Sequence, residues 1–409
     1  MRLYNTLTRR KEEFVASHLP VRLYVCGITP YDATHIGHAF TYVAFDVLVR
    51  YLELKGFPVR YVQNVTDVDD DILRQAKKLG VHWEELAREQ TGQYLADMAA
   101  LNVRRPAVMP KASEEVPKIQ EIVDVLLVRG YAYLSGGNVY FDISKDPDYG
   151  KLSRLMREQM LVLAKERGGY PDDPKKTDPL DFVLWQESAP GEPAWDSPWG
   201  KGRPGWHVEC SAMSLKYLGE TLDIHGGGED LIFPHHESEI AQSEQYTCRH
   251  PFSRFWMHTG MVRLGGEKMS KSLGNLVMVR EVLSRHSGDA LRLYLLGFHY
   301  RQGWDYQEEG LQRAEVLAGE IKEALEDWSQ PNTTEVDVAQ PVWARFVAAM
   351  EDDLDTPRAI QALPELTREI SRQKQLGGNV HESQAALARM ARVLGLEPGD
   401  SRKAAGCAR

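Results

Sequence analysis

The sequence of 409 residues is poor in cysteine and has no long apolar run. Its four cysteines (Cys26, Cys210, Cys248 and Cys407) are too few and too widely spaced for a disulfide framework, so thiols stay available for metal binding or chemistry. No stretch approaches the ~18 apolar residues of a membrane-spanning helix, and the first residues contain no apolar secretory signal. We therefore expect a cytoplasmic protein with no membrane segment.

The chain also lacks an excess of positive charge. Acidic residues outnumber basic ones by 59 to 49, which gives a net charge of −10 at pH 7. A protein held to nucleic acid mainly through phosphate contacts usually has the opposite balance, although a local basic patch stays possible. Apolar residues make up 43% and charged residues 26%, which excludes collagen-like, disordered and coiled-coil proteins. The length predicts two to three domains, and the sequence does not indicate an oligomeric state.

The first 65 residues contain a strand–helix–strand pattern. The valine-rich run at 21–26 predicts a buried strand, a helical pattern covers about 34–55, and 59–65 predicts a second strand. A βαβ unit of this length is the start of a parallel, doubly wound sheet. The predicted fold class is therefore α/β, with a Rossmann-like parallel-sheet catalytic domain.

The rest of the chain divides by composition. Helices are expected at 68–100, at 115–130 and near 152–167, with a hairpin strand at 136–143. From about residue 289 onward helical patterns dominate. The predicted parts are a split sheet domain (1–100 and 200–255), an inserted module (101–199), a region with a lysine-rich turn (256–308), a helical domain (309–397) and a flexible tail (398–409).

Two histidines flank Gly37 where the first helix begins. A helix N-terminus attracts anions, so His35 and His38 could donate to phosphate oxygens there. Gly37 would let a flat ring approach the backbone. Taken alone, this pattern is more often two surface histidines in a loop.

A lysine-rich turn follows Gly265 and Gly266. Its Lys268, Ser270 and Lys271 would neutralise the charge that builds on a leaving pyrophosphate, although alone it is a solvated basic turn. Both motifs on one βαβ scaffold, about 230 residues apart, are far more specific than either one.

A third set is dispersed along the chain. His235 and Glu239 stand four residues apart on a helix that Pro234 is expected to open, so they share a face. Cys26 ends the first strand, at the edge of the sheet where ligands bind. With Cys210 they would form a thiolate-rich Zn²⁺ site able to bind another thiolate. The alternative is that the two cysteines are buried structural residues. His236 and Glu237, beside the expected ligands, could either support the metal site or lie on the surface.

These segments resemble the cysteinyl-tRNA synthetases. The turns THIGH (34–38) and KMSKS (268–272) resemble the two signatures of class I synthetases, and YVCGITPYDATHIGHAFTYVAFD (24–46), YVQNVTDVDDDIL (61–73) and 206–244 resemble this family in particular. The resemblance implies a class I synthetase fold, a stem-contact-like region at 256–308, and activation of cysteine by ATP with Mg²⁺ to give cysteinyl-adenylate.

The resemblance also implies roles for single residues. The zinc ligands would be Cys26, Cys210, His235 and Glu239. The cysteine pocket would be lined by Gly27, Thr66, Trp206 and His225. ATP would be held by His35, Gly37, His38, Asp230, Lys268, Ser270 and Lys271. Zinc–thiolate bonding would reject serine. An apolar pocket alone would not, because it separates near-isosteres by only about 1–3 kcal/mol.

The acceptor of the cysteinyl group is less well indicated. The segments 27–39, 163–186 and 352–363 resemble the mycothiol ligase branch, which passes cysteine to the amine of glucosaminyl-inositol. Residues 311–409 hold 16 acidic and 12 basic residues, a poor match to RNA, and an anticodon-binding domain is not evident. We therefore expect this amino-sugar as acceptor. The alternative is tRNA-Cys, which His225, Glu239 and the segment 138–153 favour.

Two functions from other classes stay open. One is a nucleotidyl transferase that adenylates a different acid, in which the cysteines and His235 would have no role. The other is a non-catalytic paralogue, which the two intact signatures disfavour.

Overall fold

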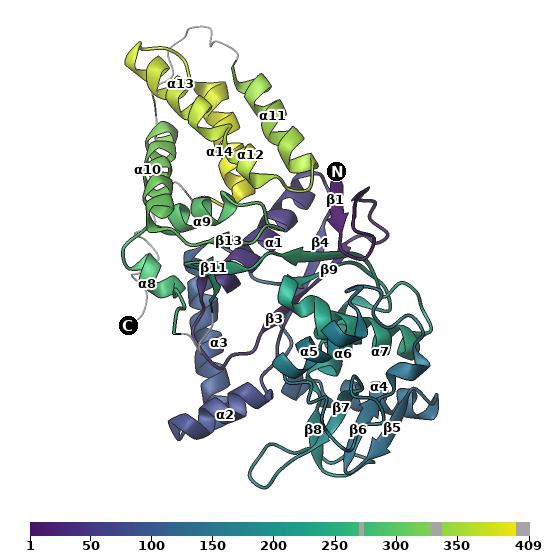
Figure 1. Ribbon diagram of the computed structural model, residues 1–409. Helices are drawn as coiled ribbons and strands as arrows, with labels where there is room; N and C mark the ends of the chain where they lie inside the picture. Colours follow the sequence, from purple (N-terminus) through teal and green to yellow (C-terminus); the bar gives the residue numbers. More distant parts are fainter. Residues whose placement is uncertain (270–273, 327, 329–337, 398–409) are drawn as a thin grey trace.

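A parallel four-stranded sheet lies at the centre of the computed structural model, which describes residues 1–269, 274–326, 328 and 338–397 (Figure 1). Its strands lie in the order β10-β9-β3-β4, and every neighbouring pair is parallel. The bounds are β3 (Val21–Ile28), β4 (Val59–Val65), β9 (Leu222–Gly228) and β10 (Ser253–Thr259). The α/β class with a parallel sheet is therefore confirmed.

The two faces of this sheet belong to two separate hydrophobic cores. Successive side chains of a strand point to opposite faces. Along β3, Leu23 and Val25 therefore join one core, which we call the helix-side core, and Tyr24 and Cys26 join the other, the module-side core. Because Cys26 points to the module side, any site built on its sulfur lies on that face.

Helices cover the helix side of the sheet. α1 (Ile36–Leu54) follows β3, and its apolar residues pack in one core with those of the C-terminal helices, most of which lie above the sheet in Figure 1. These helices are α8 (Val279–Leu283), α9 (Gly288–Leu296), α10 (Glu308–Leu325), α11 (Ala339–Glu351), α12 (Thr356–Ile360), α13 (Leu363–Gln375) and α14 (His381–Leu394).

The guanidinium of Arg292 ties α1 to these helices. It is completely buried and donates to the Asp46 carboxylate, to the Leu101 carbonyl at 2.8 Å and to the Leu394 carbonyl. Burial alone would raise the pKa of Asp46, but Arg292 and Arg50 outweigh it and hold the pKa below its usual value. The Arg292 guanidinium thus joins α9 to three segments that are far apart in sequence.

A four-stranded antiparallel sheet and four helices form the module side, at the bottom of Figure 1. The strands are β5 (Ala132–Ser135), β6 (Asn138–Phe141), β7 (Phe182–Glu187) and β8 (Gly202–Pro204). The helices are α4 (Val116–Val128), α5 (Arg157–Glu166), α6 (Trp206–Leu218) and α7 (Glu237–Thr247). The division of the chain into domains with the boundaries given above stays a prediction.

Smaller elements complete the described chain. An N-terminal hairpin is formed by β1 (Arg2–Asn5) and β2 (Arg10–Glu13), and a small sheet by β11 (Val262–Leu264), β12 (Glu267–Lys268) and β13 (Trp304–Asp305). Short helical turns are η1 (Ala112–Glu114), η2 (Ile143–Lys145), η3 (Glu229–Leu231) and η4 (Ile232–His236). Among the helices of the described residues, none is both long and apolar enough to cross a membrane.

Three expectations for local structure need correction. The helix expected at 68–100 is two helices, α2 (Asp70–Leu79) and α3 (Trp83–Ala100), because Gly80 caps α2 with a left-handed backbone at φ 70°. The helix expected near 152–167 is α5, which covers only Arg157–Glu166. The hairpin strand expected at 136–143 is also shorter, at Asn138–Phe141. Pro234 opens the helix as expected, because Phe233 before it is extended and the backbone is helical from Pro234 into α7.

Candidate active site

A cavity of about 720 Å³ lies at the carboxyl end of the parallel sheet, the usual place for ligands in such sheets. It receives side chains from the end of β3, the first turn of α1, the start of α6, the turn after β9 and β12. Of the residues predicted from the sequence, it is lined by Cys26, Gly27, His35, Gly37, His38, Trp206, Asp230, His235 and Lys268. The fold therefore brings members of all three motifs to one cavity.

The histidine motif forms the start of α1. His35 is the N-cap residue, and its Nδ1 accepts the backbone N–H of Gly37 at 3.1 Å. The rings of His35 and His38 stack with 3.8 Å between centroids. A Cβ on Gly37 would approach the His35 ring to 2.9 Å, so glycine allows this cap. The positive end of the α1 dipole and two imidazoles thus face a cavity that suits an anion.

The lysine motif reaches the same cavity from β12. Gly265 and Gly266 both have positive φ and form the tight turn between β11 and β12, which places Lys268 at the cavity wall. Farther along, the N–H groups of Ile36 and Val279 bond the carbonyls of Val277 and Thr34 at 3.0 and 2.9 Å. The chain after the lysine motif is thereby attached to the start of α1. Ser270 and Lys271, like the tail at 398–409, lie outside the described residues.

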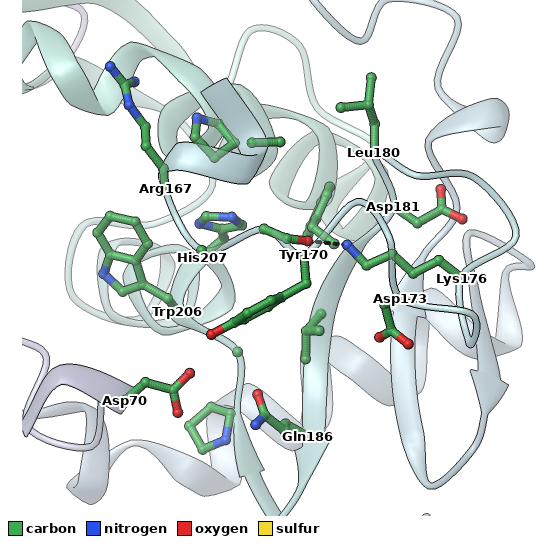
Figure 2. Close-up of a pocket in the computed structure, with 18 of the residues that line it drawn as sticks. Asp70, Arg167, Tyr170, Asp173, Lys176, Leu180, Asp181, Gln186, Trp206 and His207 are labelled. Atoms are coloured by element: carbon green, nitrogen blue, oxygen red, sulfur yellow. Dashed lines mark hydrogen bonds between the residues drawn. The ribbon is translucent and has the colours of Figure 1, made fainter. Parts of the chain in front are cut away.

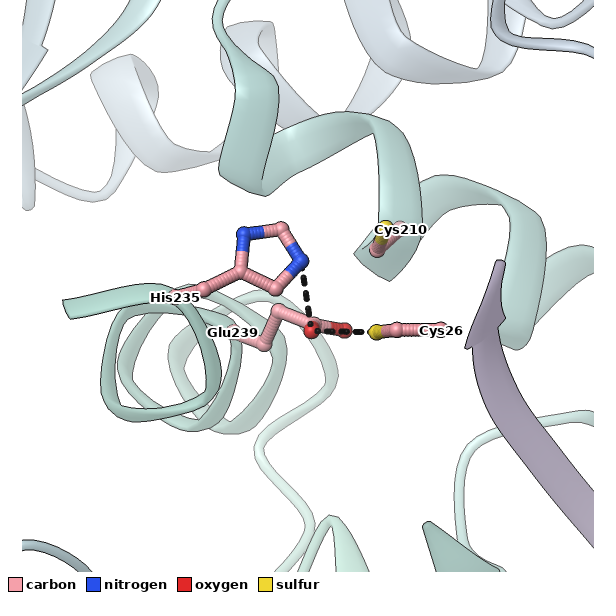
Figure 3. Close-up of side chains that lie close together, drawn as sticks. All are labelled: Cys26, Cys210, His235 and Glu239. Atoms are coloured by element: carbon pink, nitrogen blue, oxygen red, sulfur yellow. Dashed lines mark hydrogen bonds and ion pairs between the residues drawn. The ribbon is translucent and has the colours of Figure 1, made fainter. Parts of the chain in front are cut away.

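The dispersed set converges into one buried cluster (Figure 3). The ligand atoms of Cys26, Cys210, His235 and Glu239 all lie within 4.8 Å of one another, and all four side chains are buried. Glu239 Oε1 lies 3.2 Å from His235 Nε2 and 3.5 Å from Cys26 Sγ. The two cysteines are therefore neighbours in a polar cluster rather than isolated core residues.

The chemistry of this donor set fits a zinc ion. Two sulfurs, one imidazole nitrogen and one carboxylate oxygen are zinc ligands, and bonds of about 2.0–2.3 Å in a tetrahedron put the ligand atoms about 3.3–3.8 Å apart. Oε2 of Glu239 has no hydrogen-bond partner among the described residues. Burial raises the pKa of Glu239 and of the Cys26 thiol well above their ordinary values, whereas a bound cation would favour their charged forms.

A second group of ligand atoms overlaps the first. It consists of Cys26, His225, His236 and Glu239, again within 4.8 Å of one another. His225 Nε2 lies 3.6 Å from Cys26 Sγ, and its ring stacks on Trp256 with 4.4 Å between centroids. His236 is completely buried, so it is not a surface residue.

Glu237, beside His236, has a different role. Its carboxylate accepts the N–H groups of Leu152 and Ser153 at 3.1 and 2.8 Å, and it is also buried. Glu237 thus fixes the inserted segment against the start of α7.

The predicted cysteine pocket is only partly at the cavity surface. Gly27 and Trp206 line the cavity, whereas Thr66 and His225 are buried behind its wall. Thr66 Oγ1 lies 2.7 Å from Thr29 Oγ1, and Thr29 lines the cavity. The Trp206 ring lies 4.2 Å from the His235 ring, so the indole borders the cluster of Cys26, Cys210, His235 and Glu239. The roles of these residues stay predictions.

A second, smaller chamber of about 120 Å³ adjoins the cavity behind Trp206 (Figure 2). Asp69, Asp70, Arg167 and Tyr170 border both spaces, and none of them was predicted. Asp69 and Asp70 had a signal, because the acidic run at 67–71 directly follows β4 and so must lie at the carboxyl end of the sheet. Burial raises the pKa of Asp69 to about 6.

The comparisons with known proteins agree with this geometry. Residues 13–316 match the catalytic domain of class I (C) tRNA synthetases, and residues 345–397 match the DALR domain. The chain belongs to the cysteine–tRNA ligase family. It is 48% identical over 97% of its length to a cysteine–tRNA ligase of Dehalococcoides mccartyi, of which it covers 86%. It is 46% identical over 97% of its length to that of Cronobacter sakazakii, of which it covers 85%.

Solved structures show that the family fold extends to more distant synthetases. Methionyl-tRNA synthetase of Mycobacterium tuberculosis, in complex with methionyl-adenylate, matches with a TM-score of 0.65 over 92% of this chain and 90% of that one, at 17% identity. The class I synthetase fold expected from the two signatures is confirmed. The mycothiol ligase branch finds no support in the two relatives from Dehalococcoides and Cronobacter, because both are cysteine–tRNA ligases.

Proposed function

We propose that this chain activates cysteine with ATP and transfers the cysteinyl group to tRNA-Cys. The observation that carries the proposal is a cluster of two cysteines, a histidine and a glutamate in the wall of a cavity that the helix N-terminus of the histidine motif also lines. A cavity of this kind suits a nucleotide together with a small substrate that carries a thiol. The curated relatives, named cysteine–tRNA ligases, support the same substrate.

Zinc is the ion that the cluster fits best. Cys26, Cys210, His235 and Glu239 would hold it. When bound, the ion would offer a position for the substrate thiolate, for which Glu239 would yield or shift, and a serine hydroxyl would not ionise readily enough to take that position. Cys26 and His235 line the cavity, so the thiol end of the substrate would lie against this wall.

ATP would occupy the part of the cavity next to α1. The positive end of the α1 dipole, with His35 and His38, would face the phosphates, and Gly37 and Asp230 would border the nucleoside. Lys268, with Ser270 and Lys271, would stabilise the pyrophosphate as the cysteine carboxylate attacks the α-phosphorus, with Mg²⁺ on the phosphate oxygens. This step forms cysteinyl-adenylate and releases pyrophosphate.

The acceptor is then the terminal ribose hydroxyl of tRNA-Cys, which attacks the adenylate carbonyl and releases AMP. The amino-sugar expected from the sequence is replaced by its alternative. The expectation of an amino-sugar depended on three segments that resemble the mycothiol ligase branch, on an anticodon-binding domain that is not evident, and on the net charge of the last hundred residues. Net charge is a weak guide, because an RNA contact needs only a local set of cations.

One experiment separates these possibilities. Purified protein is incubated with ATP and cysteine, and pyrophosphate exchange is measured first. Either tRNA-Cys transcript or glucosaminyl-inositol is then added, and the products are identified by mass. We expect cysteine-dependent exchange and charging of the tRNA. Exchange without cysteine, or product only from the amino-sugar, would contradict the proposal. Changing Lys271 to Ala should lower the exchange rate by ~10²-fold or more.

A further inference from the structure

A chain of three hydrogen bonds runs from the metal cluster to the surface. His236 Nε2 lies 3.3 Å from Cys26 Sγ, and His236 Nδ1 lies 2.8 Å from His258 Nε2. His258 Nδ1 lies 2.8 Å from the hydroxyl of Thr6. Thr6 and His258 line a separate surface pocket of about 280 Å³. The cluster thus has a polar connection that does not pass through the catalytic cavity.

Each member of this chain is held by a different part of the fold. Thr6 directly follows β1, and its N–H donates to the Trp256 carbonyl at 2.9 Å, which fixes it beside β10. His258 is on β10, and His236 ends η4. The His236 ring lies 5.0 Å from that of His258 and 5.2 Å from that of Trp256. Both histidines are buried, and each of their ring nitrogens has a partner in the chain.

The chemistry of the cysteine end sets the direction of every bond. A thiolate sulfur can only accept, so His236 must carry its hydrogen on Nε2. A neutral imidazole has one N–H, which leaves His236 Nδ1 as an acceptor for the Nε2–H of His258. His258 Nδ1 is then an acceptor for the hydroxyl of Thr6. The three donors point the same way, toward Cys26, and bonds in such a series polarise one another.

We propose that Thr6, His258 and His236 are positioning residues that stabilise the Cys26 thiolate and orient it toward the metal. The proposal rests on the proposed function, because it takes Cys26 as a zinc ligand. It also explains why two groups of possible ligand atoms overlap at Cys26 and Glu239. Nε2 of His236 lies 3.3 Å from Cys26 Sγ, closer than His225 Nε2 at 3.6 Å, and with a hydrogen on it this nitrogen donates to the sulfur instead of binding the ion.

Thr6 offers the sharpest test, because it is the member farthest from the metal. Thr6→Val keeps the shape of the side chain and removes the hydroxyl, so it no longer fixes the hydrogen of His258. Thr6→Ser is the matched control, since it keeps the hydroxyl and removes only a methyl group. His258→Leu removes the middle of the chain. Partners of metal ligands typically change affinity by about 10–100-fold.

Two readouts are independent of catalysis. The first is the rate at which a chelator removes zinc from the full-length protein. The second is the thiolate-to-metal charge-transfer absorption after zinc is replaced by cobalt. We expect Thr6→Val to release zinc roughly 10-fold faster with a shifted absorption, His258→Leu to release it faster still, and Thr6→Ser to match wild type. Thermal melting of the metal-free proteins checks that all variants fold.

The outcomes separate this inference from the function on which it rests. Wild-type protein without stoichiometric zinc would overturn the metal assignment and the chain together. Zinc-loaded wild type, with Thr6→Val unchanged in release rate and in cobalt absorption, would overturn the chain alone. If His258→Leu fails to fold, the comparison of Thr6→Val with Thr6→Ser still decides.

Discussion

Replacing Gly27 by alanine should disable the site by forcing two strands apart. A Cβ on Gly27 would lie 1.7 Å from the backbone oxygen of Asn64 on β4, whereas ordinary contact starts at 3.4 Å. The strands would have to part by about 1.7 Å, because a backbone oxygen cannot rotate away as a side chain can. Gly27 follows Cys26 directly, so the cysteine sulfur would move as well.

The displacement would also reach the second cysteine. The Asn64 side chain accepts the N–H of Gly27 at 2.8 Å and donates to Cys210 Sγ at 3.4 Å. Misplacing reactive groups by about 1 Å can cost 10²-fold in rate. We therefore expect Gly27→Ala to lower cysteine-dependent pyrophosphate exchange by about 10²-fold or more. Overpacking of this kind also costs about 1–3 kcal/mol of stability.

The assay compares exchange rate, zinc content and thermal melting with those of Gly92→Ala. Gly92 lies in α3, where an added Cβ meets nothing within 4 Å, so this control should be active and more stable by about 0.5–1 kcal/mol. Wild-type exchange and zinc content in Gly27→Ala would refute the reasoning.

Three further predictions address the metal, a buried acid and the core. Cys210→Ser should lose zinc and the preference for cysteine over serine together, and elemental analysis with exchange assays checks both. Burial raises the pKa of Asp69 to about 6 in the folded protein. Its contribution to folding stability is therefore complete below about pH 4, where the carboxyl group is neutral, and is lost as the pH rises through 6. Relative to wild type, Asp69→Asn should therefore gain on the order of 3 kcal/mol between pH 4 and pH 7, measured by denaturant unfolding. Arg292→Met should lower the urea midpoint by the equivalent of about 3–5 kcal/mol, because it leaves the buried Asp46 charge with one partner fewer. Arg372→Ala is the control, because Arg372 forms an exposed ion pair with Glu369, and its free energy of unfolding should change by less than about 1 kcal/mol. Equal effects of the two substitutions would contradict the assignment of Arg292 to a buried ion pair that stabilises the fold.

Local patterns in the sequence were sufficient for the first two strands of the parallel sheet and for most of the cavity. The run at 21–26 and the helix after it form β3 and α1, because valine-rich buried strands and amphipathic helices leave distinct periods. Cys26, Cys210, His235 and Glu239 were grouped through the family resemblance, and the structure brings their side chains together. Residue spacing alone could not group them, because Cys26 and Cys210 are far apart in the chain and meet only through tertiary packing.

Other parts of the site had no local signal. Thr6 and His258 are common residue types in unremarkable surroundings, and only the position of the N-terminal hairpin beside β10 joins them to His236. Arg167 and Tyr170 lie in a glycine-rich stretch whose path depends on the whole inserted segment.

The separation of the two cores by the parallel sheet has a consequence for how the enzyme can change over time. The start of α1, where we propose that ATP binds, and Met269 pack into the helix-side core, whereas Cys26 and Cys210 belong to the module-side core. A loosened side chain in the first core should therefore appear as a defect in the KM for ATP, and one in the second as a defect in the KM for cysteine. Substitutions in the helix-side core could therefore adapt nucleotide binding to a new temperature, while the module-side core maintains the specificity for the thiol.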